Sequence, residues 1–245
     1  MFIFIPIILY QFCMIFPKLA AKFLRQQVAK QLPSNIPVDP HFQPGYNPWK
    51  QRLCVCPDGD YFRAFSSGKA HIVTDTIRTV TASGIELDSG KTLDADIIVT
   101  ATGLNIRLLG GIKVSIDGKL VDLSEQFMWR SSMFTSLPNL VNLFGYWNAS
   151  WTLGADTASH LFVRLIKHMD NNGYTSVVPE ISQADKKLDV SPTPLNSTYI
   201  TDSTSQIPKC ANRGPWRPRD NYFLDKWGVT KGSFTDGLKW EKKVV

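Results

Sequence analysis

The sequence predicts an α/β fold, and three observations support this prediction. Residues 16–32 repeat apolar side chains at helical spacing, and residues 77–103 contain short runs that are typical of strands. Residues 139–173 give a strand, a glycine turn and a helix in that order. The chain has 245 residues, of which 43% are hydrophobic and 20% charged, so it suffices for one large domain or two small ones.

Residues 1–32 are interpreted as an apolar N-terminal segment followed by an amphipathic helix. The run "MFIFIPIILYQFCMIF" is shorter than the roughly 20 residues that a spanning helix needs, and Pro6 is expected to break a helix early. Three interpretations stay open: contact with a membrane through residues 1–16, a buried segment, or a wrongly predicted start of the gene. The expected location is accordingly either cytoplasmic or attached to a membrane. Pro17 and Pro33 then mark the two ends of the amphipathic helix.

Residues 33–180 are expected to form the main α/β domain. A loop rich in proline leads to a short helix at 60–66, and strands are expected at "IRTVT" and "GIEL". The run "DIIVTATG" at 96–103 is apolar on both faces, which favours a buried central strand. A hairpin with an Asp117-Gly118 turn, a strand at 140–144 and a helix that ends at Gly173 follow.

Residues 181–245 are interpreted as an extended C-terminal arm that wraps a domain. The stretch "SPTPLNSTYITDSTSQIP" is rich in serine, threonine and proline, and "RGPWRPRDNYFLDKWG" then adds aromatic and basic side chains.

The net charge of +6 gathers at the two ends of the chain. The ends are either solvated or in contact with an anion such as a dinucleotide phosphate or a membrane surface. No motif typical of nucleic-acid binding is present, so we expect no nucleic-acid partner. The four cysteines form no paired framework or zinc pattern, and we expect small core side chains rather than a metal site. No G-x-S-x-G and no G-x-G-x-x-G occurs in the sequence.

Small residues at the end of the expected strand 96–103 indicate close approach of another molecule to the backbone. With "GIELDSGKTLDADIIVTATG" before Leu104 and "LPNLVNLFGY" after it, the pattern resembles the cofactor strand of flavoproteins with two dinucleotide-binding domains. The stretch "DPHFQPGYNPWKQRLCVCPDGDYFRAFSSGKAHIVTDTI" resembles the flavin-containing Baeyer–Villiger monooxygenases, most closely the group that includes the ethionamide-activating enzyme. The resemblance implies the C-terminal half of such an enzyme, with an incomplete Rossmann-like FAD domain.

The resemblance also implies a reaction. In this family NADPH reduces FAD, oxygen adds to the flavin, and the product attacks a ketone to give an ester or lactone; sulfides are also oxidised. FAD, NADPH and a small-molecule ketone or sulfide are therefore the expected cofactors and substrate. Because the glycine motifs for FAD and NADPH are absent from the sequence, we expect weak FAD binding by this chain alone. The alternative function is an inactive remnant or interaction module, either free or held on a membrane.

The site residues follow from matching the family's motifs. Arg52 in "YNPWKQRL" is the expected catalytic residue, because a permanent cation can hold an anionic oxygen species and NADP; a structural ion pair is the alternative. Lys50 stands where the family usually has an aspartate. The expected cofactor-binding residues are Thr102, Gly103, Gly145, Asn148 and Ser150.

Overall fold

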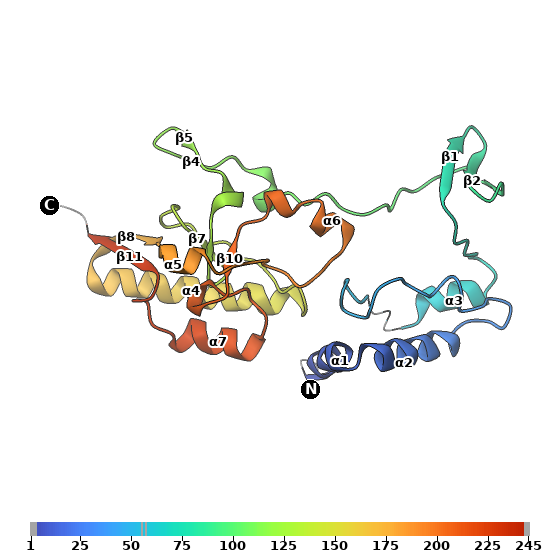
Figure 1. Ribbon diagram of the computed structural model, residues 1–245, viewed down its shortest axis with the longest axis horizontal. Coiled ribbons are helices and arrows are strands. Elements are labelled where there is room, and N and C mark those ends of the chain that lie inside the picture. The colour runs from blue at the N-terminus through green and yellow to red at the C-terminus, as the bar shows by residue number, and fades with distance from the viewer. Residues whose placement is uncertain (1–3, 55, 57, 243–245) are drawn as a thin grey trace. The chain divides into compact units, whose positions relative to one another are not determined.

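The computed structural model describes residues 4–54, 56 and 58–242. This part of the chain divides into two compact units. We call Ile8–Leu104 the N-terminal unit, and residues 105–242 together with residues 4–7 the C-terminal unit. Each unit mixes helices with short strands, in agreement with the predicted α/β class (Figure 1).

Three helices dominate the first part of the chain: α1 (Phe4–Ile15), α2 (Pro17–Ala29) and α3 (Asp60–Ser66). Helix α2 begins at Pro17 as predicted, since a proline at the first helical position gives up an N–H that would lack a partner anyway. The expected break at Pro6 does not occur, because Pro6 lies in the first turn of α1. The short helix predicted at 60–66 is confirmed.

The predicted attachment of residues 1–16 to a membrane is corrected by the structure. Within residues 4–54, 56 and 58–242, no helix has both the length and the apolar character needed to cross a bilayer. Helix α1 has 12 residues, which is well short of a span. The membrane contact and the membrane location are therefore withdrawn.

An antiparallel sheet forms the other part of the N-terminal unit. Its strands β1 (Ile77–Thr81), β2 (Gly84–Leu87) and β3 (Thr92–Asp94) lie in the order β1-β2-β3. Both strands predicted at "IRTVT" and "GIEL" are confirmed. All five residues of β1 are exposed, and Leu87 of β2 is buried.

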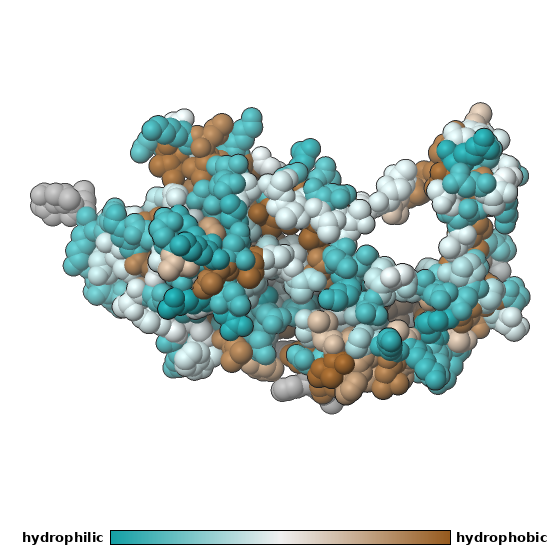
Figure 2. All heavy atoms as spheres, in the orientation of Figure 1, coloured by the Kyte–Doolittle hydropathy of each residue, from teal (hydrophilic) through white to brown (hydrophobic). Residues whose placement is uncertain are grey.

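The predicted strand at 96–103 is not formed. Residues 96–103, which follow β3, have no regular secondary structure. Within the described residues, their N–H groups donate no backbone hydrogen bond. Ile97 is 82% exposed and Val99 84% exposed, so this segment shows apolar area to solvent instead of being buried. A strand needs a neighbour for its backbone groups, and none of the described strands lies beside it. Figure 2 shows hydrophobic residues (brown) at the surface near β1 and at α1.

The cysteines divide into two classes. Cys13 and Cys210 are buried, as predicted for small core side chains. The same prediction is wrong for Cys54 and Cys56, which are exposed in the loop before α3. Among the described residues no group of His, Cys, Asp and Glu could hold a metal ion.

The C-terminal unit surrounds the long helix α4. Its helices are α4 (Trp151–Asn172), α5 (Gln183–Lys186), α6 (Thr198–Thr201) and α7 (Tyr222–Lys231), with short 3-10 turns η1 (Leu108–Gly111), η2 (Leu123–Glu125), η3 (Thr204–Gln206) and η4 (Gly214–Trp216). Its strands are β4 (Ser115–Ile116), β5 (Lys119–Leu120), β6 (Met128–Trp129), β7 (Met133–Phe134), β8 (Tyr174–Pro179), β9 (Asp189–Val190), β10 (Cys210–Ala211) and β11 (Leu238–Lys242).

These strands pair in antiparallel twos: β4 with β5, β6 with β7, β8 with β11, and β9 with β10. The β4–β5 hairpin turns at Asp117 and Gly118, both with positive φ, as the Asp-Gly signal predicts. Helix α4 ends at Gly173, whose φ of 66° gives the predicted left-handed cap. The strand predicted at 140–144 is wrong, because only single hydrogen bonds such as Asn142 N to Ser132 O (2.6 Å) reach this stretch.

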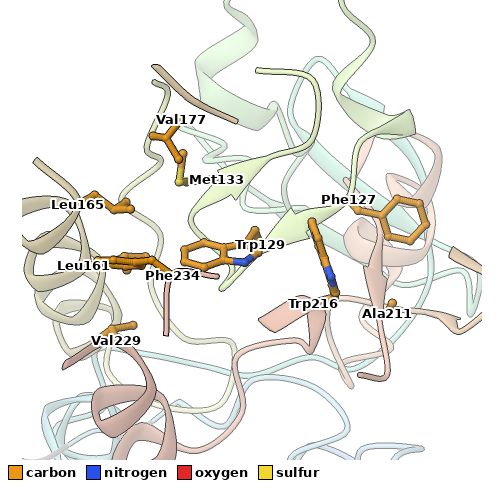
Figure 3. Packing of buried hydrophobic residues seen from close by; sticks show 10 residues of the cluster. All are labelled: Phe127, Trp129, Met133, Leu161, Leu165, Val177, Ala211, Trp216, Val229 and Phe234. Atoms are coloured by element: carbon orange, nitrogen blue, oxygen red, sulfur yellow. The ribbon is translucent and has the colours of Figure 1, made fainter. Parts of the chain in front are cut away.

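A large hydrophobic cluster joins segments between Phe127 and Phe234 of the C-terminal unit. Trp129 and Met133 of β6 and β7 pack with Leu161 of α4, and all three are 0% exposed (Figure 3). Trp216 of η4 and Phe234 after α7 complete the same cluster. The segment from Ala211 to Phe234 therefore contributes directly to the core, since large aromatic side chains dominate its buried area.

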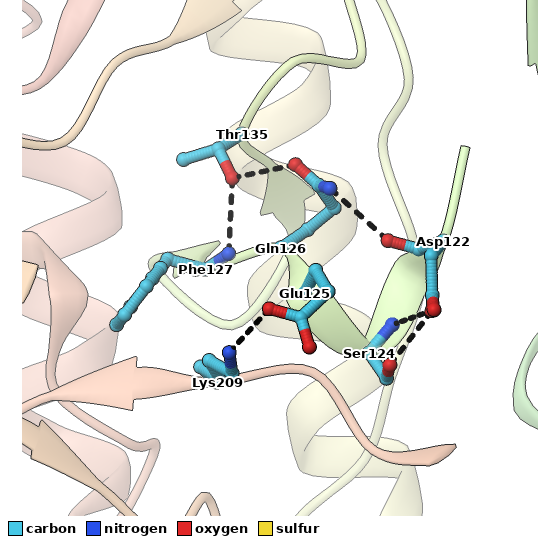
Figure 4. A network of polar contacts seen from close by, with 7 residues as sticks. All are labelled: Asp122, Ser124, Glu125, Gln126, Phe127, Thr135 and Lys209. Atoms are coloured by element: carbon cyan, nitrogen blue, oxygen red, sulfur yellow. Dashed lines mark hydrogen bonds and ion pairs between the residues drawn. The ribbon is translucent and has the colours of Figure 1, made fainter. Parts of the chain in front are cut away.

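A polar network fixes the approach to β6 (Figure 4). Asp122 caps η2 by accepting from Ser124 N at 2.9 Å, and Gln126 Nε2 donates to the Asp122 carbonyl at 3.0 Å. The main-chain N–H of Phe127 donates to Thr135 Oγ1 at 3.0 Å. Lys209 pairs with Glu125 at 2.6 Å and ties η2 to the tail before β10. These contacts position β6 and β7, which support the loop before α4.

Candidate functional site

The start of α4 and the loop 144–150 bring three of the predicted site residues together: Gly145, Asn148 and Ser150. Ser150 is the N-cap residue of α4, but its side chain makes no cap hydrogen bond. Its Oγ lies instead 2.9 Å from Thr152 Oγ1. The first turn of this 22-residue helix therefore keeps N–H groups without a side-chain acceptor, at the positive end of the helix dipole.

Gly145 lets α4 pack directly against the loop backbone. A Cβ at Gly145 would lie 2.3 Å from the ring of Trp151, and a Cβ at Gly154 would lie 2.6 Å from the Gly145 main chain. Both positions therefore exclude any larger residue. The structure gives Gly145 a packing role inside the chain, next to the cofactor role that the sequence predicts.

Arg219, from the segment before α7, holds this loop and helix together. It is 6% exposed, and its guanidinium donates to the carbonyls of Phe144 and Gly154 and to Ser132 Oγ. Burial lowers the pKa of Arg219 from its ordinary value. The guanidinium also lies 5.5 Å from the ring centre of Tyr146. One side chain thus fixes both sides of the turn that leads into α4.

Tyr146 and Asp225 form a second buried contact with this loop. Tyr146 is 1% exposed, and its hydroxyl donates to Asp225 Oδ2 at 2.8 Å. Burial raises the pKa of the Asp225 carboxyl, and burial together with the neighbouring Asp225 charge raises the pKa of Tyr146. Both groups therefore hold their protons more tightly than they do in water.

The side chain of Asn148 is held in place by Asp220. It is 8% exposed, and its Nδ2 donates at 3.0 Å to both the carbonyl oxygen and Oδ1 of Asp220. Its own Oδ1 is buried, and no donor of the described chain reaches it. Of the side chains in this loop, Asn148 is therefore the one that keeps an unused hydrogen-bonding atom inside the protein.

The other predicted site residues, Arg52, Thr102 and Gly103, belong to the N-terminal unit. All three are exposed. Gly103 has φ +113°, a conformation that favours glycine, and a Cβ there would meet no atom within 4 Å. Arg52 follows Trp49, which has a positive φ of 66°. Earlier in the same proline-rich loop, His41 Nδ1 lies 2.8 Å from Thr74 Oγ1, and Asp39 pairs with Arg25.

Arg219, Asp220 and Asp225 are functional candidates that the sequence did not single out. Their partners lie 65 to 89 residues away along the chain, so no local pattern reveals the contacts. The only signal is a cluster of charges among aromatic residues in "RDNYFLD". Such a cluster is unusual for a solvated tail, because the aromatic side chains favour burial.

The sequence comparisons find close relatives. No family model matches the sequence. The chain is 44% identical over 228 residues to the probable FAD-binding monooxygenase AlmA of Acinetobacter baylyi, covering 93% of this chain and 46% of that protein. It is 42% identical over 237 residues to the FAD-containing monooxygenase EthA of Mycobacterium tuberculosis, covering 96% of this chain and 48% of that protein. The chain spans about half the length of these curated relatives.

Solved structures share the fold. The chain matches OTEMO in complex with FAD and NADP with a TM-score of 0.63 at 16% identity, over 91% of this chain and 45% of that one. It matches a cyclohexanone-bound cyclohexanone monooxygenase with a TM-score of 0.60 at 16% identity, over 92% of this chain and 44% of that one. At this identity the likeness establishes the fold.

The start of α4 offers part of what a flavin ring needs. Its uncapped N–H groups suit an electron-rich edge of a ring. Asn148 Oδ1 has no hydrogen-bond partner among the described residues, and solvent does not reach it. The sequence offers no glycine-rich loop for the phosphates of FAD. Contact of Gly145, Asn148 and Ser150 with a cofactor stays a prediction.

Proposed function

Over nearly all of its length the chain is homologous to one half of the FAD-containing monooxygenases, and from this premise we propose that it forms the C-terminal half of an FAD- and NADPH-dependent monooxygenase. The proposed reaction is oxidation of a small ketone to an ester or lactone, or oxidation of a sulfide. One observation carries the proposal: identity of 42% to 44% extends through both units, across the Arg52 loop and the start of α4.

In this proposal the start of α4 receives the flavin ring. FAD, when bound, would be reduced by NADPH and would then activate oxygen. Asn148 and the N–H groups behind Ser150 are the proposed cofactor contacts of the C-terminal unit. Thr102 and Gly103 are the proposed cofactor contacts of the N-terminal unit, because Gly103 has no side chain to block close approach.

Arg52 supplies a permanent positive charge in the proposed reaction. A guanidinium stays protonated at every physiological pH and can stabilise negative charge on oxygen or on a nucleotide phosphate. Arg52 is exposed, which leaves it accessible to a bound molecule. Its neighbour Lys50 adds a second cation, where the family usually has an aspartate.

A chimaera tests the proposal. Residues 16–245 replace the matching half of the M. tuberculosis relative EthA, and the product is assayed for FAD content and for lactone formation from cyclohexanone with NADPH. We expect the chimaera to bind FAD and oxygenate the ketone. Arg52→Ala should abolish lactone formation while NADPH still reduces the flavin, and Arg63→Ala, in exposed α3, is the matched control. A folded, flavin-loaded chimaera without oxygenation contradicts the proposal.

A second candidate function is an interaction module. The observation that favours it is the exposed apolar segment with Ile97, Val99 and Leu104, which lacks any strand partner among the described residues. Such a module would pair with a polypeptide that resembles the other half of the relatives. Co-purification with the separately expressed other half of EthA, without any oxygenation, would favour this function.

A further inference from the structure

Arg130, in the turn between β6 and β7, lines a cavity of the C-terminal unit. The cavity has a volume of about 340 Å³, and its wall runs from this turn past η4 to α7. Among the described residues that line it are none of Gly145, Asn148 and Ser150. Its volume lies in the range of pockets that bind small molecules. The cavity is therefore a candidate ligand site separate from the proposed cofactor contacts.

The guanidinium of Arg130 has no hydrogen-bond acceptor among the described residues. Its Nε is buried without a partner, and no carboxylate of the described chain lies within 4 Å of its nitrogens. Burial, and after it the like charge of Arg164, lowers the pKa of Arg130 from its ordinary value. Burying a charge costs free energy unless the charge is paired. An anion in the cavity would supply the pairing that the chain itself does not.

Two glycines leave space for this guanidinium beside the end of α7. A Cβ at Gly228 would lie 2.7 Å from Arg130 Nη1, and a Cβ at Gly232 would lie 2.5 Å from Nη2. The main-chain carbonyls of Val229 and Gly232 accept hydrogen bonds from Arg164, at 3.0 and 2.6 Å. Arg130 therefore packs against the helix end without using these carbonyls, and its N–H groups stay available to a ligand.

The charges on the cavity wall favour an anion. Arg217 also lines the wall, and its side chain is exposed and forms no ion pair within the described chain. Arg219 lines it too, with its guanidinium bonded to main-chain carbonyls. The two acids of the wall, Asp220 and Asp225, already accept hydrogen bonds from the loop before α4. Three permanent cations thus outnumber two carboxylates, and two of these cations keep unused donors.

Apolar side chains of α7 form part of the same wall. Leu224 is 68% exposed and Trp227 is 65% exposed, although both are large and apolar. Inorganic phosphate would leave this surface in water, whereas an apolar group attached to an anion would cover it. A guanidinium also presents pairs of N–H groups that match the two oxygens of a carboxylate. The wall therefore suits a carboxylate that carries an apolar body.

We propose that this cavity binds a small organic carboxylate, whose carboxylate group pairs with Arg130 and whose apolar body packs on Trp227 and Leu224. The site lies wholly within the C-terminal unit. Its binding therefore does not depend on the proposed monooxygenase function, and the two can be tested separately.

Titration calorimetry on the full chain tests the site with phenylacetate and its uncharged amide, phenylacetamide. We expect phenylacetate to bind about tenfold more tightly, as for the gain of charge-assisted hydrogen bonds. Arg130→Gln should remove this difference, whereas Arg107→Gln, at an exposed arginine outside the cavity, should keep it. Trp227→Ser should weaken binding of phenylacetate but not of acetate, because acetate has no apolar body to pack on the ring.

The possible outcomes decide between the site and its alternatives. Equal affinity for phenylacetate and phenylacetamide overturns the proposal, and so does a difference that persists in Arg130→Gln. Tighter binding of inorganic phosphate than of phenylacetate overturns the ligand class. Absence of saturable binding of phenylacetate up to about 10 mM overturns the site. If Arg130→Gln does not fold, the comparison of acid and amide on the wild-type chain and on the exposed variant Trp227→Ser decides.

Discussion

The two units differ in how completely they bury their apolar side chains. In the C-terminal unit Trp129, Met133 and Leu161 are 0% exposed, and their cluster draws on segments between Phe127 and Phe234. In the N-terminal unit the whole of β1 is exposed, and Ile97 and Val99 are more than 80% exposed. The C-terminal unit therefore supplies its own core, whereas the N-terminal unit shows apolar surface that another polypeptide segment could cover.

The largest effect is expected from the core of the C-terminal unit. Trp129→Ala should lower the free energy of unfolding by about 3–5 kcal/mol, because it leaves a cavity and removes the bond from Trp129 Nε1 to the Asp236 carbonyl (2.9 Å). Val80→Ala, on exposed β1, is the matched change in the other unit and should cost less than about 1 kcal/mol. Urea unfolding measures both. Equal losses of unfolding free energy for the two variants would contradict the difference in burial between the two units.

Two glycine substitutions, one in each unit, test the same difference in packing. Gly145→Ala should cost about 1–3 kcal/mol, because its Cβ would collide with the Trp151 ring at 2.3 Å. Gly103→Ala meets no atom within 4 Å, so its cost comes only from the φ of +113° and should be about 1 kcal/mol, at the low end of the range for strained backbone. Thermal unfolding of the two variants is the measurement. A larger loss for Gly103→Ala would show that the segment 96–103 is packed.

The pH dependence of stability tests the burial of Asp225. Burial raises its pKa above the ordinary value of 3.8, so the folded chain binds this proton more tightly than the unfolded chain. The free energy of unfolding should therefore fall as the pH rises from 3.8 through the folded pKa. Asp225→Asn, which still accepts from Tyr146, should remove this fall, while the exposed Asp170→Asn on α4 should keep it. Identical pH profiles for wild type and Asp225→Asn would contradict the burial.

The smallest effect on stability is expected in the exposed segment. Ile97→Ser and Val99→Ser should change the free energy of unfolding by less than about 0.5 kcal/mol, since both side chains already contact solvent. They should nevertheless reduce binding of a hydrophobic fluorescent dye, because they remove exposed apolar area. Thr100→Ala is the control on the same segment. Strong destabilisation by Ile97→Ser would indicate that this segment is buried in solution.

Elements with local signals could be predicted from the sequence. The Asp117-Gly118 turn, the start of α2 at Pro17 and the end of α4 at Gly173 each depend on residues within one turn of chain. The strand at 96–103 could not be predicted correctly, because an apolar run forms a strand only beside another strand. Cys54 and Cys56 show the same limit, since small apolar character alone does not decide burial.

The candidate site could be predicted only in part. The sequence pointed to the loop with Gly145, Asn148 and Ser150, and the structure brings these residues together at the start of α4. It could not reveal Arg219 and Asp220, because their contacts join segments far apart along the chain. Whether Arg52 and Gly103 act on the same cofactor stays a prediction, since both lie in the other unit.

Hydrogen exchange of the full chain tests most directly the claim that one unit supplies its own core and the other offers uncovered surface. We expect slow exchange for the amides of α4 around Leu161 and of the β8–β11 pair, which are hydrogen-bonded in the C-terminal unit. We expect exchange near the rate of an unfolded chain for residues 96–103, whose N–H groups find no backbone partner in the described structure. Protection of 96–103 equal to that of α4 would contradict the account, because it would show that this segment already has its partner.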